Sequence, residues 1–96
     1  MYARRVILGN PVGFHIRPAT VFMEAASRFR SAIEVVRDER TADGKSAISL
    51  MLLEAPQGAR LTIRANGEDE VAAVEALVDL VERHFGDSEA SSETKS

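Results

Sequence analysis

The chain of 96 residues has no cysteine and no tryptophan, and only five of its residues are aromatic. Without cysteine it forms neither disulfides nor thiolate metal sites, which suits a reducing compartment. It also lacks the roughly 20 consecutive apolar residues that a membrane-spanning helix needs. Its first eight residues contain no apolar stretch long enough for a signal peptide. We therefore expect a cytoplasmic protein that does not insert into a membrane.

Several motifs of known chemistry are missing as well. The isoelectric point is near 5.3 and no run is rich in lysine or arginine, which makes nucleic acid a poor candidate partner. The two histidines, His15 and His84, have no neighbouring ligands at metal-site spacing. Glycine patterns for nucleotides and a serine in the setting of a hydrolase nucleophile are also absent. The sequence predicts no metal, no cofactor and no turnover reaction, so the protein would be a substrate of enzymes.

The net charge of −3 is unevenly distributed. Residues 1–53 have a balance of +3, with eight basic and five acidic side chains. Residues 54–96 have a balance of −6, with four basic and ten acidic side chains. A basic half favours an acidic protein partner or a phosphate group.

The pattern of residues predicts one domain over 1–86 and a disordered acidic tail over 87–96, since the tail is polar and has no periodicity. Strands are expected over residues 4–8, 32–36, part of 37–44, and 60–65. Helices are expected over about 16–30, 46–53 and 68–85. The last helix is predicted to bury a stripe of Val71, Val74, Val78, Val81 and Phe85.

The strand over residues 60–65 shows how these elements should pack. Its apolar residues Leu61, Ile63 and Ala65 alternate with polar ones, so one face lies in the core and the other in water. The helices likewise have single apolar stripes. The order strand-helix-strand-strand-helix-strand-helix therefore predicts an α+β fold in which helices cover one face of a sheet. Little apolar surface is left over, so we expect a monomer.

The segment GFHIRPA, residues 13–19, places a histidine between a glycine-containing loop and a predicted helix. A helix start offers free N–H donors and a partial positive charge, which favours an anion there. Arg17 adds a guanidinium that binds phosphate oxygens, and Pro18 fixes the backbone of the first turn. Imidazole is a good nucleophile when neutral, and a helix start disfavours its protonated form. From the residues alone, His15 is either a phosphoryl acceptor or a histidine that only flanks a helix.

The predicted helix over residues 46–53 has more apolar surface than one buried face needs. We assign Leu50 and Leu53 to the core, and Ile48 and Met51 to a surface that docks a partner. A methionine suits a surface that must fit several partners, because its side chain adapts readily. Complete burial of the helix is the alternative. Ser46 is a good N-cap for this helix.

The segment GFHIRPA resembles the active-site signature of HPr, the family of histidine-containing phosphocarrier proteins of the bacterial phosphotransferase system. Residues 45–53, KSAISLMLL, together with Gln57 and Gly58, resemble the family's second signature. Length and element order match over about residues 1–86. The resemblance implies an open-faced β-sandwich, with a four-stranded antiparallel sheet covered on one face by three helices.

The resemblance also implies a function and its partners. His15 would be phosphorylated at Nδ1 by a phosphoenolpyruvate-dependent enzyme I and would pass the group to an enzyme IIA-type acceptor, with Arg17 stabilising the phosphate and Pro18 starting the helix. In some members the serine matching Ser46 is a regulatory site for an HPr kinase/phosphorylase. One departure is Val12, where family members often carry Asn or Ser. The alternatives are a regulatory docking module, of nitrogen-related or catabolite-control type, and a small interaction domain that is never phosphorylated.

Overall fold

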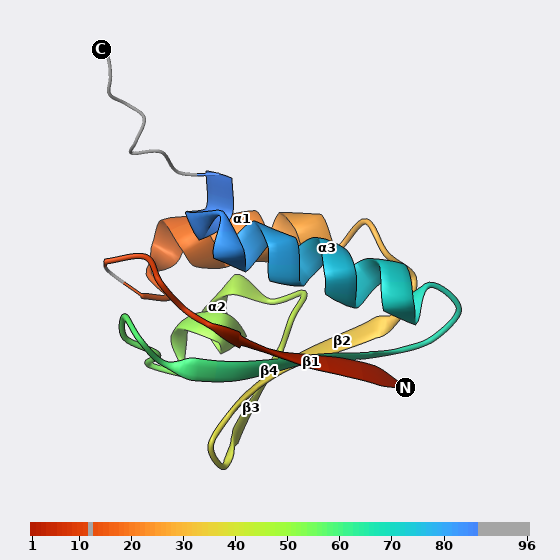
Figure 1. Cartoon of the computed structure of the whole chain (residues 1–96), viewed down its shortest axis with the longest axis horizontal. Helices are drawn as coiled ribbons and strands as arrows, with labels where there is room; N and C mark the ends of the chain where they lie inside the picture. Colours follow the sequence, from red (N-terminus) through yellow and green to blue (C-terminus); the bar gives the residue numbers. More distant parts are fainter. Residues whose placement is uncertain (12, 87–96) are drawn as a thin grey trace.

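The fold contains four strands, three α-helices and one short 3₁₀ turn, in a computed structural model that describes residues 1–11 and 13–86 (Figure 1). The strands are β1 (Tyr2–Ile7), β2 (Ala32–Arg37), β3 (Arg40–Asp43) and β4 (Arg60–Asn66). The helices are α1 (Ile16–Ala26), α2 (Ala47–Met51) and α3 (Glu70–Glu82), and the 3₁₀ turn is η1 (His84–Gly86). The tail prediction falls on residues 87–96, which lie outside the described residues, as does Val12. Within the described part of the chain, no helix has the length and apolar character needed to cross a membrane.

The strands form one antiparallel sheet in the order β1-β4-β2-β3. The three helices lie on one face of it, and the other face is open (Figure 1). The register sets Val6 opposite Leu61 and Val35 opposite Ile63, and all four side chains are buried beneath the helices. The α+β fold and the one-sided burial predicted from strand alternation are therefore confirmed.

The core lies between the sheet and the helices. Its largest fully buried side chains include Leu8, Phe22, Leu50, Leu53, Leu61, Ile63 and Leu77. Burying one such side chain contributes roughly 1.5–3 kcal/mol, so this layer supplies most of the driving force for folding. The predicted burial of Leu50 and Leu53 in α2 is confirmed.

Helix α1 ends at Ala26, four residues before the predicted end at about residue 30. The N–H groups of Arg28 and Phe29 donate to the carbonyls of residues three positions earlier, at 3.2 and 3.1 Å, which tightens the chain into a turn. Phe29 is still half-buried and packs against the core. The apolar period continued past the helix end because the turn also faces the core.

Helix α3 is shorter than predicted and buries a different stripe. Its inner face consists of Ala73, Val74, Leu77, Val78 and Val81. Val71 is 53% exposed, so its assignment to the inner stripe was wrong, because it lies in the first turn at the flank of that face. Phe85 is buried as predicted, but it lies beyond the helix in a left-handed conformation with φ of 63°.

One carboxylate ties the start of α3 to the start of β2. Asp69 accepts hydrogen bonds from the Ser31 hydroxyl at 2.6 Å and from the N–H groups of Arg30 and Ser31, both at 2.9 Å. These bonds, that from the Ser31 hydroxyl most of all, lower the pKa of Asp69 from 3.8 to about 2. These bonds join the starts of α3 and β2, which lie at the end of the sandwich opposite the start of α1 (Figure 1).

The lowered pKa of Asp69 predicts an acid-dependent loss of stability. Because the folded form holds the proton less tightly than the unfolded form, the stabilisation is present above about pH 4 and is lost as the pH falls towards about 2. The variant Asp69→Asn keeps the shape without the charge, so we expect it to be less stable than wild type near neutral pH. Urea unfolding at several pH values should show this difference shrinking with acid. A difference that stays constant down to about pH 2 would contradict the prediction.

Candidate functional site

His15 stands where the sequence predicts it, at the N-cap position of α1. Its backbone is extended, with φ of −86° and ψ of −177°, and its carbonyl accepts the Ala19 N–H at 3.0 Å. The imidazole makes no capping hydrogen bond and is exposed to solvent. The backbone of His15 therefore belongs to the helix, whereas its side chain is free to react.

The start of α1 leaves hydrogen-bond donors beside this imidazole. The N–H groups of Ile16 and Arg17 are too near the helix start to bond within the helix, and Pro18 has no N–H. No carbonyl or side chain of the described residues accepts either N–H. The Arg17 guanidinium is exposed and has no ion-pair partner within the described part of the chain. These donors and this cation make the position suitable for an anion.

The loop before His15 is fixed by a close turn at Gly13. Gly13 has φ of +68°, and its N–H donates to the Asn10 carbonyl at 3.1 Å. The buried Asn10 side-chain amide donates in return to the Gly13 carbonyl at 2.7 Å. The Phe14 N–H donates to the Ala55 carbonyl at 3.0 Å, which joins the loop to the segment after α2. Neither Asn10 nor Ala55 was predicted from the sequence as a support for the site.

Aromatic packing anchors the residue just before His15. The Phe14 ring is buried, with its centroid 5.7 Å from that of Phe22 in an edge-to-face arrangement. It lies equally close to the ring of Phe85, which follows α3. Such aromatic pairs contribute about 0.5–1.5 kcal/mol beyond their buried area. His15 therefore projects from a backbone held on both sides, by buried Phe14 and buried Pro18.

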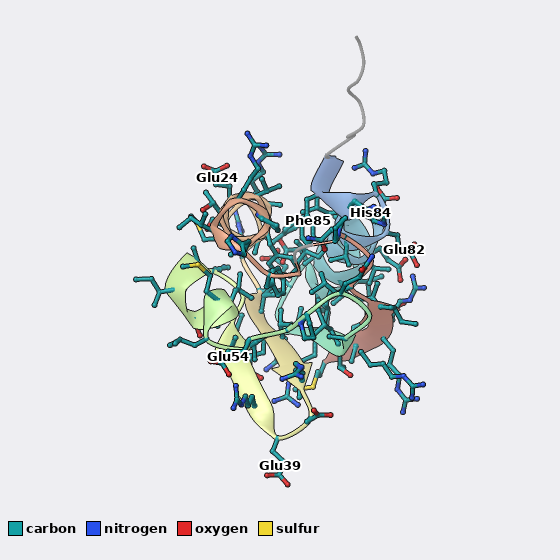
Figure 2. All side chains as sticks on the ribbon, turned by 90° about the vertical axis from the view of Figure 1, so that its left-hand side faces the viewer. Glu24, Glu39, Glu54, Glu82, His84 and Phe85 are labelled. Carbon is teal, nitrogen blue, oxygen red and sulfur yellow. The ribbon has the colours of Figure 1, made fainter. Side chains whose placement is uncertain are left out.

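A cavity of about 430 Å³ opens at this end of the molecule. It is lined by His15, Arg17 and Pro18 from α1, by the loop at Asn10, and by the turn containing His84. Figure 2 looks at this end and shows Phe85 between α1 and the end of α3, with His84 on the α3 side. No local pattern in the sequence predicts that His84 and His15 line one cavity, because 69 positions separate them. The described residues contain no group of three His, Cys, Asp or Glu side chains that could hold a metal ion.

Ser46 caps α2, as its residue type predicts. Its hydroxyl oxygen accepts the Ser49 N–H at 3.2 Å. The Lys45 ammonium turns away from this end to donate to the Phe29 carbonyl at 2.8 Å, so it joins α2 to the turn after α1. Whether Ser46 is modified stays a prediction.

The exposed apolar side chains of α2 differ in part from those predicted. Ile48 is 69% exposed, whereas Met51 is half-buried and packs against the core. Leu52, which follows the helix, is 68% exposed and was not predicted to be so. Ile16, next to His15, is also exposed, at 59%. The docking role of Ile48 and Met51 stays a prediction, but most of the exposed apolar area of this segment belongs to Ile48 and Leu52.

Comparisons with known proteins agree with this arrangement. A family model described as the PTS HPr component phosphorylation site matches residues 2–83. The phosphocarrier protein HPr of Neisseria meningitidis is 34% identical over 89 residues, which cover 93% of this chain and all of that protein. A crystal structure of HPr from Thermoanaerobacter tengcongensis superposes with a TM-score of 0.87 at 39% identity, covering 91% of this chain and 98% of that one.

A second solved structure is also similar. The Bacillus subtilis catabolite repression containing protein Crh superposes with a TM-score of 0.71 at 34% identity. The match covers 86% of this chain and 95% of that protein.

The open-faced sandwich and the exposed histidine at the start of α1 define a small protein of the phosphocarrier class. The family model covers 82 of the 96 residues, and full-length relatives exceed 30% identity. The chain belongs to the HPr family of the phosphotransferase system. The family resemblance found in the two sequence motifs is therefore confirmed.

Proposed function

We propose that His15 accepts a phosphoryl group from a phosphoenolpyruvate-dependent enzyme I and passes it to an enzyme IIA-type acceptor. The observation that carries the proposal is the exposed imidazole of His15 at a helix start whose first N–H groups, like the imidazole itself, have no hydrogen-bond partner among the described residues. Membership of the HPr family supplies the reaction class. The proposal includes a cytoplasmic monomer, because a carrier must diffuse between its partners.

The proposed reaction is a direct transfer between two proteins. The lone pair on the Nδ1 atom of His15 attacks phosphorus and forms a new P–N bond. The bond between phosphorus and the donor group of enzyme I breaks at the same time, and its electron pair stays with the donor. Phosphoryl transfer needs little from the protein beyond positioning and stabilisation of charge. The N–H groups of Ile16 and Arg17 and the Arg17 guanidinium donate to the phosphoryl oxygens. The next acceptor then takes the group in the same way, and the carrier is regenerated without turning over a substrate of its own.

A labelling experiment tests the carrier function. The purified chain is mixed with enzyme I, Mg²⁺ and labelled phosphoenolpyruvate, and we expect one acid-labile, base-stable label for each chain. The His15→Ala control should take no label from enzyme I, because no other imidazole of the described residues is exposed at the start of an α-helix. Adding an enzyme IIA domain should then discharge the label. The carrier proposal is wrong if the wild-type chain takes no label from the enzyme I of its own organism.

The similarity to Crh favours a second candidate, a regulatory docking module that acts through its phosphorylation state. In that case an HPr kinase/phosphorylase would modify Ser46, where a phosphate would lie at the start of α2 and add negative charge near the exposed Ile48. Intact mass spectrometry after incubation with such a kinase separates the candidates. If Ser46 stays unmodified and phospho-His15 is discharged to an enzyme IIA-type acceptor, the carrier function is supported and the regulatory module is excluded.

A further inference from the structure

The turn after α3 has an unusual backbone. His84 and Phe85 are consecutive residues with φ of 53° and 63°, in the left-handed region that disfavours residues other than glycine. Strained conformations of this kind persist only where surrounding contacts impose them, and they gather at functional sites.

One aromatic contact and two backbone hydrogen bonds hold the turn. The Phe85 ring is buried against Phe14, the residue next to His15, with 5.7 Å between their centroids. The Arg83 N–H continues the helical hydrogen bonding to Asp79 at 3.0 Å, and the Gly86 N–H closes the turn onto the Arg83 carbonyl at 3.1 Å. Turning Phe85 inward leaves His84 outside, at the surface (Figure 2).

The turn brings His84 to the wall of the cavity that contains His15 and Arg17. Its ring lies over the backbone at Gly9, because a Cβ atom built on Gly9 would come within 2.8 Å of the His84 Nε2 atom. A side chain at Gly9 would therefore displace the imidazole from this position. No hydrogen bond within the described part of the chain engages the side chain of His84.

The charges around His84 are mainly positive. A second, more open hollow of about 630 Å³ lies on its other side and is lined by Arg5 of β1, Arg60 of β4 and Glu82 of α3. Arg5 and Arg60 make no ion pair with any described residue. With Arg17 on the α1 side, the described residues that line these two hollows carry three guanidinium groups and one carboxylate, a balance that favours a phosphoryl anion over a cation.

We propose that His84 is a second phosphoryl-binding residue, whose ring N–H donates a hydrogen bond to an oxygen of the phosphoryl group carried by His15. This inference rests on the proposed phosphorylation of His15 and adds a donor from the opposite wall of the cavity. The N–H groups of α1 and Arg17 hold the group from one side, and His84 holds it from the other. Donors that bind the charged oxygens stabilise the phosphorylated state over the free carrier.

The test uses the full chain phosphorylated chemically, so that it does not depend on recognition by enzyme I. With phosphoramidate as donor, the P–N bond of the reagent breaks, ammonia leaves and the new P–N bond forms on the imidazole. Phosphorus NMR follows the lifetime of phospho-His15, and nitrogen NMR follows the His84 ring. The His15→Ala chain reports any label taken by His84 itself, and that signal is subtracted.

Two substitutions at His84 suit its left-handed backbone. His84→Gly removes the imidazole without adding strain, and His84→Asn tolerates the conformation while keeping an N–H donor. We expect the glycine variant to shorten the lifetime of phospho-His15 about threefold to tenfold, and the asparagine variant to recover part of the loss. Arg83→Ala is the matched control, because Arg83 is exposed, pairs with Asp79 at 2.9 Å and does not line the cavity.

The outcomes separate this inference from the function it rests on. Movement of the His84 nitrogen signals on phosphorylation of His15, with the expected order of lifetimes, supports the inference. Unmoved His84 signals, or a glycine-variant lifetime within about twofold of wild type, would overturn it while leaving the carrier function intact. If His84 had only a structural role, the substitutions would lower the urea midpoint, but the lifetime of phospho-His15 would be the same in the asparagine and glycine variants. If neither phosphoramidate nor enzyme I labels His15, both proposals fail.

Discussion

Replacing Gly13 with alanine is expected to lower the free energy of unfolding by about 3 kcal/mol. The φ of +68° at this position already disfavours a residue with a Cβ atom. The new methyl group would also overlap the Ala55 carbonyl oxygen and lie 2.9 Å from the Pro56 Cα atom. Because both neighbours are backbone, neither can move aside as the end of a side chain would. The loop before His15 would have to shift or unfold locally.

Gly58→Ala separates the two causes of this lower free energy of unfolding, which are backbone strain and the overlap with neighbouring backbone atoms. Gly58 also has a left-handed backbone, with φ of +89°, but a Cβ atom there would meet nothing within 4 Å. We therefore expect Gly58→Ala to cost only about 1–2 kcal/mol, the strain of the backbone alone. Urea unfolding of both variants measures the difference. Equal losses would show that the overlap with Ala55 does not matter and that the loop is less rigid than its contacts indicate.

The second large effect is expected for Ile48→Asp in the transfer from enzyme I. Ile48 is 69% exposed on a helix that lies beside α1, so it offers apolar area for a partner that must reach His15. A charge buried in such an interface costs ~2 kcal/mol or more, which corresponds to about a thirtyfold loss in transfer efficiency. Initial rates over a range of carrier concentrations would show the loss mainly as a higher KM.

Val71→Asp provides the matched control for this docking prediction. Val71 is an exposed β-branched residue on a helix, like Ile48, but it lies near the start of α3, at the end of the molecule away from the His15 loop (Figure 1). We expect this variant to accept phosphate at the wild-type rate. Urea unfolding checks that both variants are folded. If Ile48→Asp is phosphorylated as efficiently as Val71→Asp, the docking surface does not include α2.

The elements and the position of His15 at the start of α1 were predictable because local patterns determine them. Strand alternation in residues 60–65 identified the buried face of β4, and the residues around His15 identified the start of α1. These signals need no knowledge of distant segments. The prediction of Ser46 as a helix N-cap has the same local basis.

The details that failed depend on contacts between segments far apart in the sequence. Helix α1 stops at Ala26 because the following turn must lead into β2, while Phe29 keeps the apolar period going. Phe85 continued the apolar pattern of α3, but its contact with Phe14 draws it out of the helix and brings His84 towards His15. Because 69 residues separate His84 from His15, no local sequence pattern predicts that both line the same cavity.

The pairing of β1 with β4 has a consequence for the order in which the molecule assembles. Tyr2 lies opposite Ala65 in the sheet. Phe14 likewise contacts Phe85, which lies near the other end of the domain's sequence. A nascent chain that has emerged from the ribosome only as far as α1 therefore contains His15 but not the contacts that surround it in the finished fold. Contacts this distant in sequence slow folding, since a long loop must close before they form. The site is thus among the last parts to be completed, after α3 has been synthesised, and a truncated product would compete poorly for the partners of the finished protein.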